Sequence, residues 1–189
     1  MKVLATNVSN LTDARYFAAW GVDCLVFEGD PNGATYMQPP QMKEIVEWVE
    51  GPEVGISYEG ISVPENAEEI AASIEWQHLI IGPFIDRKDL PNAKNIYRKA
   101  NLDFDFSEDE KVIVALEKGI KELSASEESK LRELASSKEL FLLGGFGADD
   151  LKVVEDLGVE GIVLQGGEEE KVGYKSYDEL DDILEELYP

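Results

Sequence analysis

The chain has 189 residues, with 17 Lys and Arg against 40 Asp and Glu, and its formal net charge at pH 7 is −23. This length is typical of one domain, so we expect residues 1–189 to fold as a single unit, and a hydrophobic content of 43% excludes a disordered acidic tail. The strong negative charge makes nucleic acid and anionic membranes unsuitable partners.

The cysteine content and the apolar runs indicate the compartment. Cys24 is the only cysteine, so no disulfide can form within the chain. The first residues contain too short an apolar stretch for a signal peptide, and no run approaches the roughly 18 apolar residues that span a bilayer. We therefore expect a cytoplasmic protein.

Short apolar runs alternate with stretches of helical pattern along the chain. The expected strands are residues 2–5, 24–27, 54–58, 78–81, 95–98, 111–116, 140–143 and 161–164. The clearest helices are residues 11–20, 40–49, 67–74, 127–136, 149–157 and 176–187, and the alternation as a whole predicts seven or eight. The connection between the fifth and sixth strands is rich in Asp and Phe, so its helix is expected to be short or missing.

This alternation predicts βαβ units and a parallel sheet. Eight strands close naturally into a compact (β/α)8 TIM barrel, so the fold class is α/β. An open doubly wound sheet is the alternative if the fifth strand does not form. Ser9 or Asn10 is expected to cap the first helix, and Gly21 to end it.

Two glycine pairs follow the last two expected strands. Glycine lets backbone N–H groups approach an anion closely, and barrel enzymes often hold a phosphate in the loops after strands seven and eight. Tight turns are the alternative explanation for both pairs. The phosphate site that this pattern predicts consists of Gly144, Gly145, Gly166 and Gly167.

Barrel active sites gather at the carboxyl ends of the strands. The polar residues at these ends are Thr6, Asn7, Glu28, Asp30, Tyr58, Glu59 and Glu117. Glu28 and Glu117 can act as general acid or base if burial raises their pKa, although a solvated carboxylate at a loop start is the ordinary interpretation of each. His78 and Cys24 begin apolar strands; with neither a second His nor a cysteine pair we expect no metal site and interpret both as core residues.

Several motifs resemble phosphoribosylanthranilate isomerases. Residues 3–15 (VLATNVSNLTDAR), followed by residues 21–23 (GVD), are similar to that family's opening V-K-I-C-G-I-T-N-L-x-D-A and G-A/V-D. Residues 36–41 (YMQPPQ) resemble R-Y-V-S-P-E-Q, and residues 54–56 (VGI) resemble the V-G-V-F strand. Residues 144–146 (GGF) resemble the A-G-G-L phosphate loop, and residues 173–176 (GYKS) the closing P-G-x-K-D. The matches run in order across most of the chain.

The resemblance implies a (β/α)8 barrel that binds a phosphorylated small molecule. It also implies the isomerisation of phosphoribosylanthranilate in tryptophan biosynthesis without a metal or organic cofactor, by a cysteine base after strand one and an aspartate acid after strand six. Thr6 stands at the base position, followed by Asn7 in place of a glycine, and Glu117 stands at or near the acid position. Thr35 and Ile81 stand where the family has an arginine and a histidine.

These departures separate the functional interpretations. A threonine hydroxyl is too weakly acidic to replace a thiolate without a neighbouring base. We therefore expect a diverged phosphate-binding barrel without the normal isomerase chemistry, which binds a phosphorylated ligand, uses Glu28 or Glu117 for another reaction, or serves as a non-catalytic partner. The alternative is an active phosphoribosylanthranilate isomerase in which one of these carboxylates replaces the cysteine. A third interpretation, an acidic scaffold, requires both glycine pairs to be mere turns, and a homodimer is left open.

Overall fold

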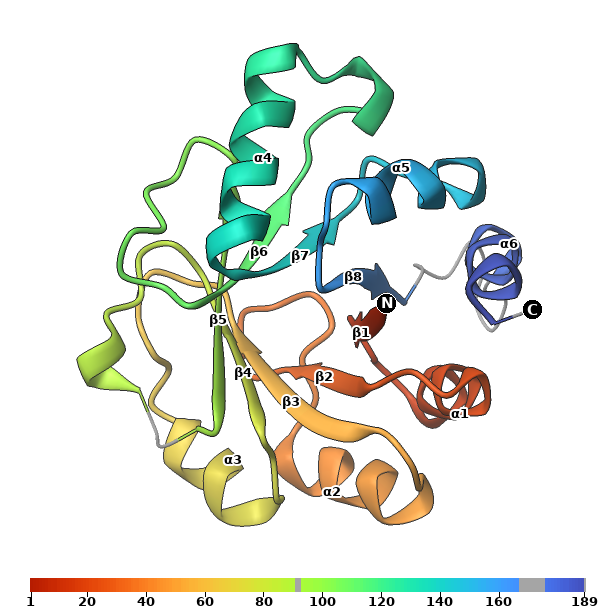
Figure 1. Cartoon of the computed structure of the whole chain (residues 1–189). Coiled ribbons are helices and arrows are strands. Elements are labelled where there is room, and N and C mark those ends of the chain that lie inside the picture. Colours follow the sequence, from red (N-terminus) through yellow and green to blue (C-terminus); the bar gives the residue numbers. More distant parts are fainter. Residues whose placement is uncertain (91–92, 167–175, 189) are drawn as a thin grey trace.

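The computed structural model in Figure 1 describes residues 1–90, 93–166 and 176–188. Eight parallel strands pair in chain order and close into a barrel, which confirms the TIM barrel and excludes the open sheet. The strands are β1 (Lys2–Thr6), β2 (Cys24–Glu28), β3 (Glu53–Tyr58), β4 (His78–Ile81), β5 (Asn95–Asn101), β6 (Lys111–Ala115), β7 (Glu139–Leu143) and β8 (Gly161–Gln165).

The helices form an outer ring that is open between α3 and α4 (Figure 1). They are α1 (Leu11–Trp20), α2 (Pro39–Trp48), α3 (Ala67–Ser73), α4 (Ala125–Ser137), α5 (Leu151–Asp156) and α6 (Asp178–Leu187). Three 3-10 turns add to them, namely η1 (Arg87–Asp89), η2 (Ile120–Glu122) and η3 (Ala148–Asp150). The described part of the chain thus has six α-helices, fewer than the seven or eight that the alternation predicts. In the β4–β5 connection the described residues form only η1. The connection from β5 to β6 has no helix, as expected.

Local signals explain where α1 begins and ends. The Asn10 side chain accepts a hydrogen bond from the Asp13 N–H, which confirms Asn10 as the cap. Gly21 follows the helix with φ +74°, a left-handed conformation that glycine adopts without a steric penalty. Among the described residues no helix is long and apolar enough to cross a membrane.

Strand alternation divides the core into two layers. Apolar residues such as Leu4, Val26, Ile80, Tyr97 and Phe141 form one cluster inside the barrel. The residues between them along each strand pack against the helices in a second, larger cluster. Because side chains alternate with a period of two, the residues two positions beyond an inward one also face the barrel axis.

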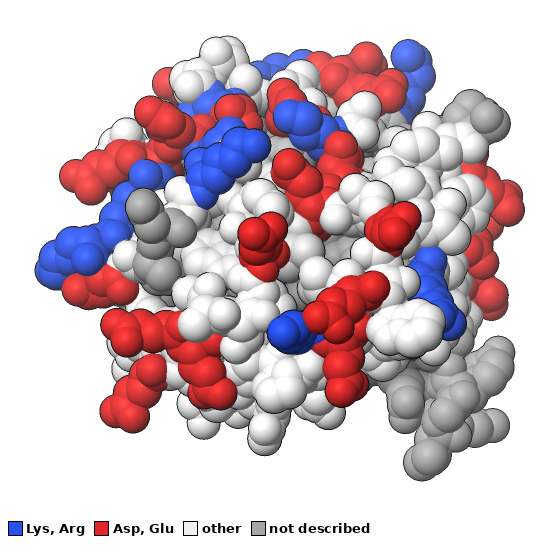
Figure 2. Space-filling model, turned by 90° about the horizontal axis from the view of Figure 1, so that it is seen from below, with Lys and Arg blue, Asp and Glu red and all other residues white. Residues whose placement is uncertain are grey.

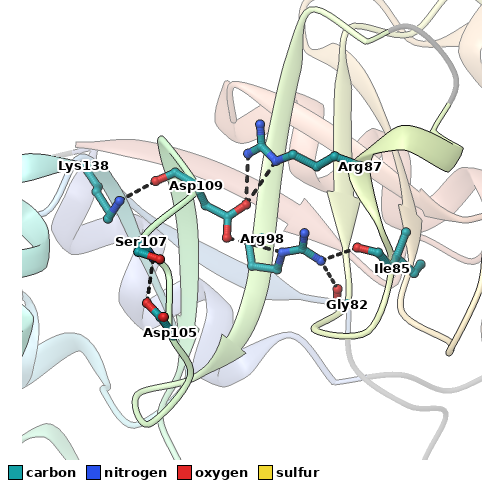
Figure 3. A network of polar contacts seen from close by, with 8 residues as sticks. All are labelled: Gly82, Ile85, Arg87, Arg98, Asp105, Ser107, Asp109 and Lys138. Atoms are coloured by element: carbon teal, nitrogen blue, oxygen red, sulfur yellow. Dashed lines mark hydrogen bonds and ion pairs between the residues drawn. The ribbon is translucent and has the colours of Figure 1, made fainter.

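Loops held by a buried ion pair cover the barrel where helices are absent (Figure 3). Arg98 points outward from β5 with 7% exposure, and its Nη1 donates to the carbonyls of Gly82 and Ile85 at 2.6 and 2.7 Å. Its Nε lies 3.4 Å from Asp109, which is 4% exposed and also binds Arg87 at 3.0 Å. Charged groups this buried require such partners. The network therefore joins the β4–β5 and β5–β6 connections.

The amino-terminal end of the barrel is a polar floor. His78 is 7% exposed; its Nδ1 lies 3.2 Å from the Tyr97 hydroxyl, and its Nε2 pairs with Glu53. This confirms a structural histidine with satisfied ring nitrogens. Cys24 is fully buried inside the barrel, and burial raises the pKa of its thiol, so its interpretation as a core residue is also confirmed. Polar groups at this end of a TIM barrel usually serve stability.

Candidate functional site

The opposite, carboxyl-terminal end carries the candidate site. We call it the mouth and define it by Thr6, Glu28, Glu59, Lys99 and Glu117, which lie at or just beyond the ends of five different strands. Thr6, Glu28 and Lys99 stand two residues beyond the inward residues Leu4, Val26 and Tyr97, so all three face the barrel axis. The chain fold thus brings together residues that lie far apart in the sequence.

The first position of the mouth holds no activated nucleophile. Thr6 is 5% exposed, and its hydroxyl donates to the Leu164 carbonyl at 3.4 Å. No described carboxylate or histidine is hydrogen-bonded to it. The next residue, Asn7, has φ +56°, in the left-handed region that Asn tolerates better than most residues. The chain therefore turns at Asn7 in a left-handed conformation without a glycine.

Glu28 has the most perturbed carboxyl group of the mouth. Burial raises its pKa to about 7, and the nearby carboxylates of Glu59 and Asp30 act in the same direction. A hydrogen bond from the Asp30 N–H to Oε1, at 3.0 Å, and the positive charge of Lys99 act against this rise. Gly33 passes so close that a Cβ there would clash with the Glu28 side chain. The condition for Glu28 to act as acid or base at neutral pH is therefore met.

A lysine that the sequence analysis missed also faces the mouth. Lys99 donates to both carboxylate oxygens of Glu59, at 2.8 and 2.6 Å, and its side chain is only 19% exposed. The ion pair spans the end of β4, where a Cβ on Gly82 would lie 2.8 Å from the Glu59 carbonyl oxygen. The expected fifth strand ended at Arg98, whereas β5 continues to Asn101. The sequence did carry a signal for Lys99. It stands two residues after Tyr97, so a strand that continues past Arg98 points both side chains into the barrel.

The remaining candidates differ in burial. Tyr58 is 1% exposed on the helix side of β3, its hydroxyl has no hydrogen-bond partner among the described residues, and burial raises its pKa. Glu117 is exposed instead and lines a pocket of about 330 Å³ with Asn101 and Lys118. Ile81 is fully buried between barrel and helices, so its position offers nothing to the mouth.

The first glycine pair forms a tight turn after β7. Gly144 and Gly145 have φ values of +72° and +73°, which other residues rarely adopt. A Cβ on Gly145 would lie 2.5 Å from the Lys118 carbonyl oxygen, and the Gly145 carbonyl accepts from the Ile120 N–H at 2.6 Å. This close packing of two loops is a structural reason for glycine, and it leaves the phosphate prediction untested.

The second pair is only partly described. The Gly166 N–H donates to the Thr6 carbonyl at 2.9 Å, which extends the pairing of β8 with β1. Gly167 lies outside the described residues, as do the first three of the closing motif at 173–176. The backbone N–H of Gly166 is therefore already hydrogen-bonded and is not free to donate to an anion.

Acidic groups gather on the outer side of the loop after β7. Gly147 lines a pocket with five carboxylate residues, which are Asp149, Asp150, Asp182, Glu185 and Glu186. Its N–H donates to Asp150 at 3.0 Å, and Lys121 pairs with the same carboxylate at 2.5 Å. This neighbourhood opposes a bound anion, so a phosphate has to approach this loop from the barrel side. No group of three or more His, Cys, Asp or Glu in the described ranges is arranged to hold a metal ion.

Comparison with known proteins shows the fold. No family model and no curated protein matches the chain. Among solved structures, phosphoribosyl anthranilate isomerase from Thermus thermophilus has a TM-score of 0.74 at 18% identity, over 99% of this chain and 98% of that one. A structure of monomers of the dimeric enzyme from Thermotoga maritima has a TM-score of 0.73 at 15% identity, over 98% and 97%.

A third isomerase structure contains reduced 1-(o-carboxyphenylamino)-1-deoxyribulose 5-phosphate. Its TM-score is 0.67 at 14% identity, over 98% of this chain and 97% of that one. At such identities the likeness establishes a shared barrel architecture over the full length, and the chemistry of the mouth has to be argued from its own residues.

Proposed function

We propose that the chain is a diverged barrel of the phosphoribosylanthranilate isomerase type, which binds a phosphorylated small molecule at its mouth and transfers protons through Glu28. The observation that carries the proposal is the half-buried Glu28 carboxyl group, with its pKa near 7, at the carboxyl end of β2. A group with this pKa both accepts and releases protons readily at neutral pH. Thr6 cannot replace it, because its hydroxyl contacts only a carbonyl oxygen.

The phosphorylated ligand is supported by position and by the likeness to known structures. Gly144 and Gly145 follow β7, and Gly166 follows β8, which are the strands after which barrels commonly hold phosphate. One matching isomerase was solved with a deoxyribulose 5-phosphate derivative. In our proposal the phosphate lies against these two loops from the barrel side, away from the acidic groups around Gly147.

An active phosphoribosylanthranilate isomerase is the second candidate. The full-length match to several structures of that enzyme favours it. In this case Glu28 serves as the base and Glu117, at or near the acid position of the resemblance, as the acid. Loss of one such group typically costs a factor of about 10² to 10⁴ in rate, so Glu117→Gln should lower turnover by that amount.

A fluorescence assay with phosphoribosylanthranilate separates these possibilities. The proposal expects no turnover above the uncatalysed background, together with saturable binding of the reduced carboxyphenylamino-deoxyribulose phosphate measured by calorimetry. Turnover that Glu28→Gln abolishes supports the active isomerase instead. Absence of both turnover and binding would overturn the two proposals and leave the acidic scaffold.

A further inference from the structure

We propose that Lys99 is a second catalytic residue of the mouth, whose ammonium group binds the carbonyl oxygen of the ligand while Glu28 removes a proton from the adjacent carbon. This inference rests on the proposed function and names its substrate class, a phosphorylated sugar with a carbonyl group. The comparisons and the sequence motifs assign no role to this lysine.

The position of Lys99 is the first argument. Among the described residues at the inward carboxyl ends of the strands, it is the only cation. The other polar residues there are Thr6, Glu28, Ser57, Glu59, Asn101, Glu117 and Gln165. Oxygen atoms that become negative during a reaction need a cation or an N–H donor within the site. Of the described side chains at this end, Lys99 is the one that meets this need with a full positive charge.

The second argument is that its surroundings fix Lys99 in place. Glu59 holds the ammonium through both carboxylate oxygens, and the side chain is 19% exposed. The preceding residue, Arg98, binds the carbonyls of Gly82 and Ile85 on the outside of the barrel, which anchors this end of β5 (Figure 3). Electrostatic stabilisation is most effective when the charged group needs no rearrangement during the reaction.

The third argument is the relation between Lys99 and Glu28. The two side chains face the same end of the barrel axis, and the positive charge of Lys99 lowers the pKa of Glu28 against the effects of burial, Glu59 and Asp30. The ammonium group therefore acts on the carboxylate across the mouth. A base beside a fixed cation is the arrangement that proton abstraction next to a carbonyl requires.

The step balances without any other reactant. The Glu28 carboxylate takes the proton, the C–H electron pair becomes the C=C bond of an enolate, and the carbonyl π pair moves to the oxygen held by Lys99. Return of the proton to the same carbon restores the substrate and the carboxylate. In D2O the carboxyl group exchanges with solvent between these events, so the carbon acquires deuterium.

Deuterium uptake therefore tests the inference before any product is known. The wild-type chain is incubated in D2O with ribulose 5-phosphate or ribose 5-phosphate, and the labelled carbon is followed by NMR. We expect Lys99→Met to slow the exchange about 100-fold or more, the typical effect of losing one stabilising donor. Lys99→Arg keeps the charge and should retain part of the rate.

Lys111→Met is the matched control. Lys111 is also 19% exposed and also pairs with a glutamate, Glu139, but it begins β6 and lies at the floor of the barrel. Lys111→Met removes an ion pair comparable to that of Lys99 but changes nothing at the mouth. Deuterium exchange in this variant should therefore stay at the wild-type rate. Thermal unfolding of both variants shows whether each still folds.

The pH profile of the exchange is a second test, because a purely structural role of Lys99 would leave this profile unchanged. Without Lys99 the pKa of Glu28 should rise, because the positive charge that opposes its rise is gone. The acid limb of the residual rate should therefore shift to higher pH in Lys99→Met and stay in place in Lys111→Met. An unshifted limb with an unchanged rate would overturn the role of Lys99 and leave the proposed function intact. No exchange by the wild-type chain with either compound would overturn both the role of Lys99 and proton transfer by Glu28.

Discussion

Glu28 illustrates at the scale of one residue how surroundings change a side chain. In the sequence only its position at the end of an expected strand distinguishes it from the many other carboxylates. In the fold it is half-buried at the end of β2, beside Gly33 and the carboxylates of Glu59 and Asp30. Its pKa rises from 4.5 to about 7 for these reasons. The same shift has a consequence for folding stability.

The stability of the protein should depend on pH through Glu28. Between pH 4.5 and about 7 the native state holds the Glu28 proton more tightly than the unfolded state, so this group makes stability fall as pH rises through that window. Glu28→Gln removes the effect. We expect the variant to gain free energy of unfolding relative to wild type between pH 4.5 and pH 8, measured by urea denaturation.

The exposed Glu117 provides the comparison for this measurement. Glu117→Gln removes an exposed carboxyl group of the same mouth and is measured at the same two pH values. If the difference between Glu28→Gln and wild type is independent of pH, the carboxyl group of Glu28 is not buried as described.

Two glycines of one loop should respond differently to the same substitution. Gly145 combines φ +73° with a Cβ position 2.5 Å from a carbonyl oxygen, whereas Gly147 has no atom within 4 Å and φ −124°. Gly145→Ala should lower the free energy of unfolding by about 1–3 kcal/mol, and Gly147→Ala should change it by less than about 0.5 kcal/mol. Urea denaturation of both variants checks this, and equal values would contradict the described loop packing.

At the scale of elements, the connections on either side of β5 replace two helices with loops. A TIM barrel ordinarily covers each strand with a helix. Here Arg98, Asp109 and the aromatic rings of Phe104 and Phe106 cover this part of the barrel instead. Because one buried arginine binds both connections, their stability should depend on it more than on any surface ion pair.

Removal of this arginine should therefore be costly. Arg98→Met leaves Asp109 buried at 4% exposure with only the partly exposed Arg87 as its ion-pair partner. We expect a loss of about 3–5 kcal/mol in the free energy of unfolding, the usual cost of breaking a buried pair. Arg87→Met, which removes the 39% exposed partner, should cost about 1 kcal/mol or less. Similar losses in the two variants would show that Arg98 is not the anchor.

At the scale of the whole molecule, net charge is the dominant electrostatic feature. Acidic side chains are spread over the face in Figure 2, with basic ones lying among them, and the chain as a whole carries −23. Such self-repulsion destabilises a compact state. Salt shortens the distance over which these charges act, from about 10 Å at 0.1 M to about 3 Å at 1 M.

Stability should consequently rise with ionic strength. We expect the urea midpoint at pH 7 to increase between 0.05 M and 1 M KCl, because screening relieves repulsion in the folded state more than in the expanded unfolded chain. Near the sequence pI of 4.2 the net charge is small, so the same addition of salt should have a much weaker effect. A midpoint that does not respond to salt at pH 7 would show that local ion pairs compensate the net charge.

Sequence periodicity was sufficient for the barrel. Each strand and helix is encoded by a short run of residues, so β4 was predicted with its observed bounds and the cap of α1 was narrowed to Ser9 or Asn10. The missing helix between β5 and β6 was predicted too. The loop between β4 and β5 was not, because it is held by Arg98, whose partners lie in other segments. Strand and cap signals depend only on residues that are neighbours in the chain, so they can be recognised from the sequence alone.

The mouth was only partly accessible from sequence. Strand ends identified Thr6, Glu28 and Glu117 as candidates, since every strand of a parallel barrel points its carboxyl end to the same face. Which of them is buried, and the pairing of Lys99 with Glu59 across 40 positions of the chain, depend on contacts between distant segments. The sequence by itself thus determined the architecture and the face that carries the site. Only the tertiary structure decided which carboxyl group is desolvated and which cation lies beside it, because burial and distance across the barrel are properties of the closed fold.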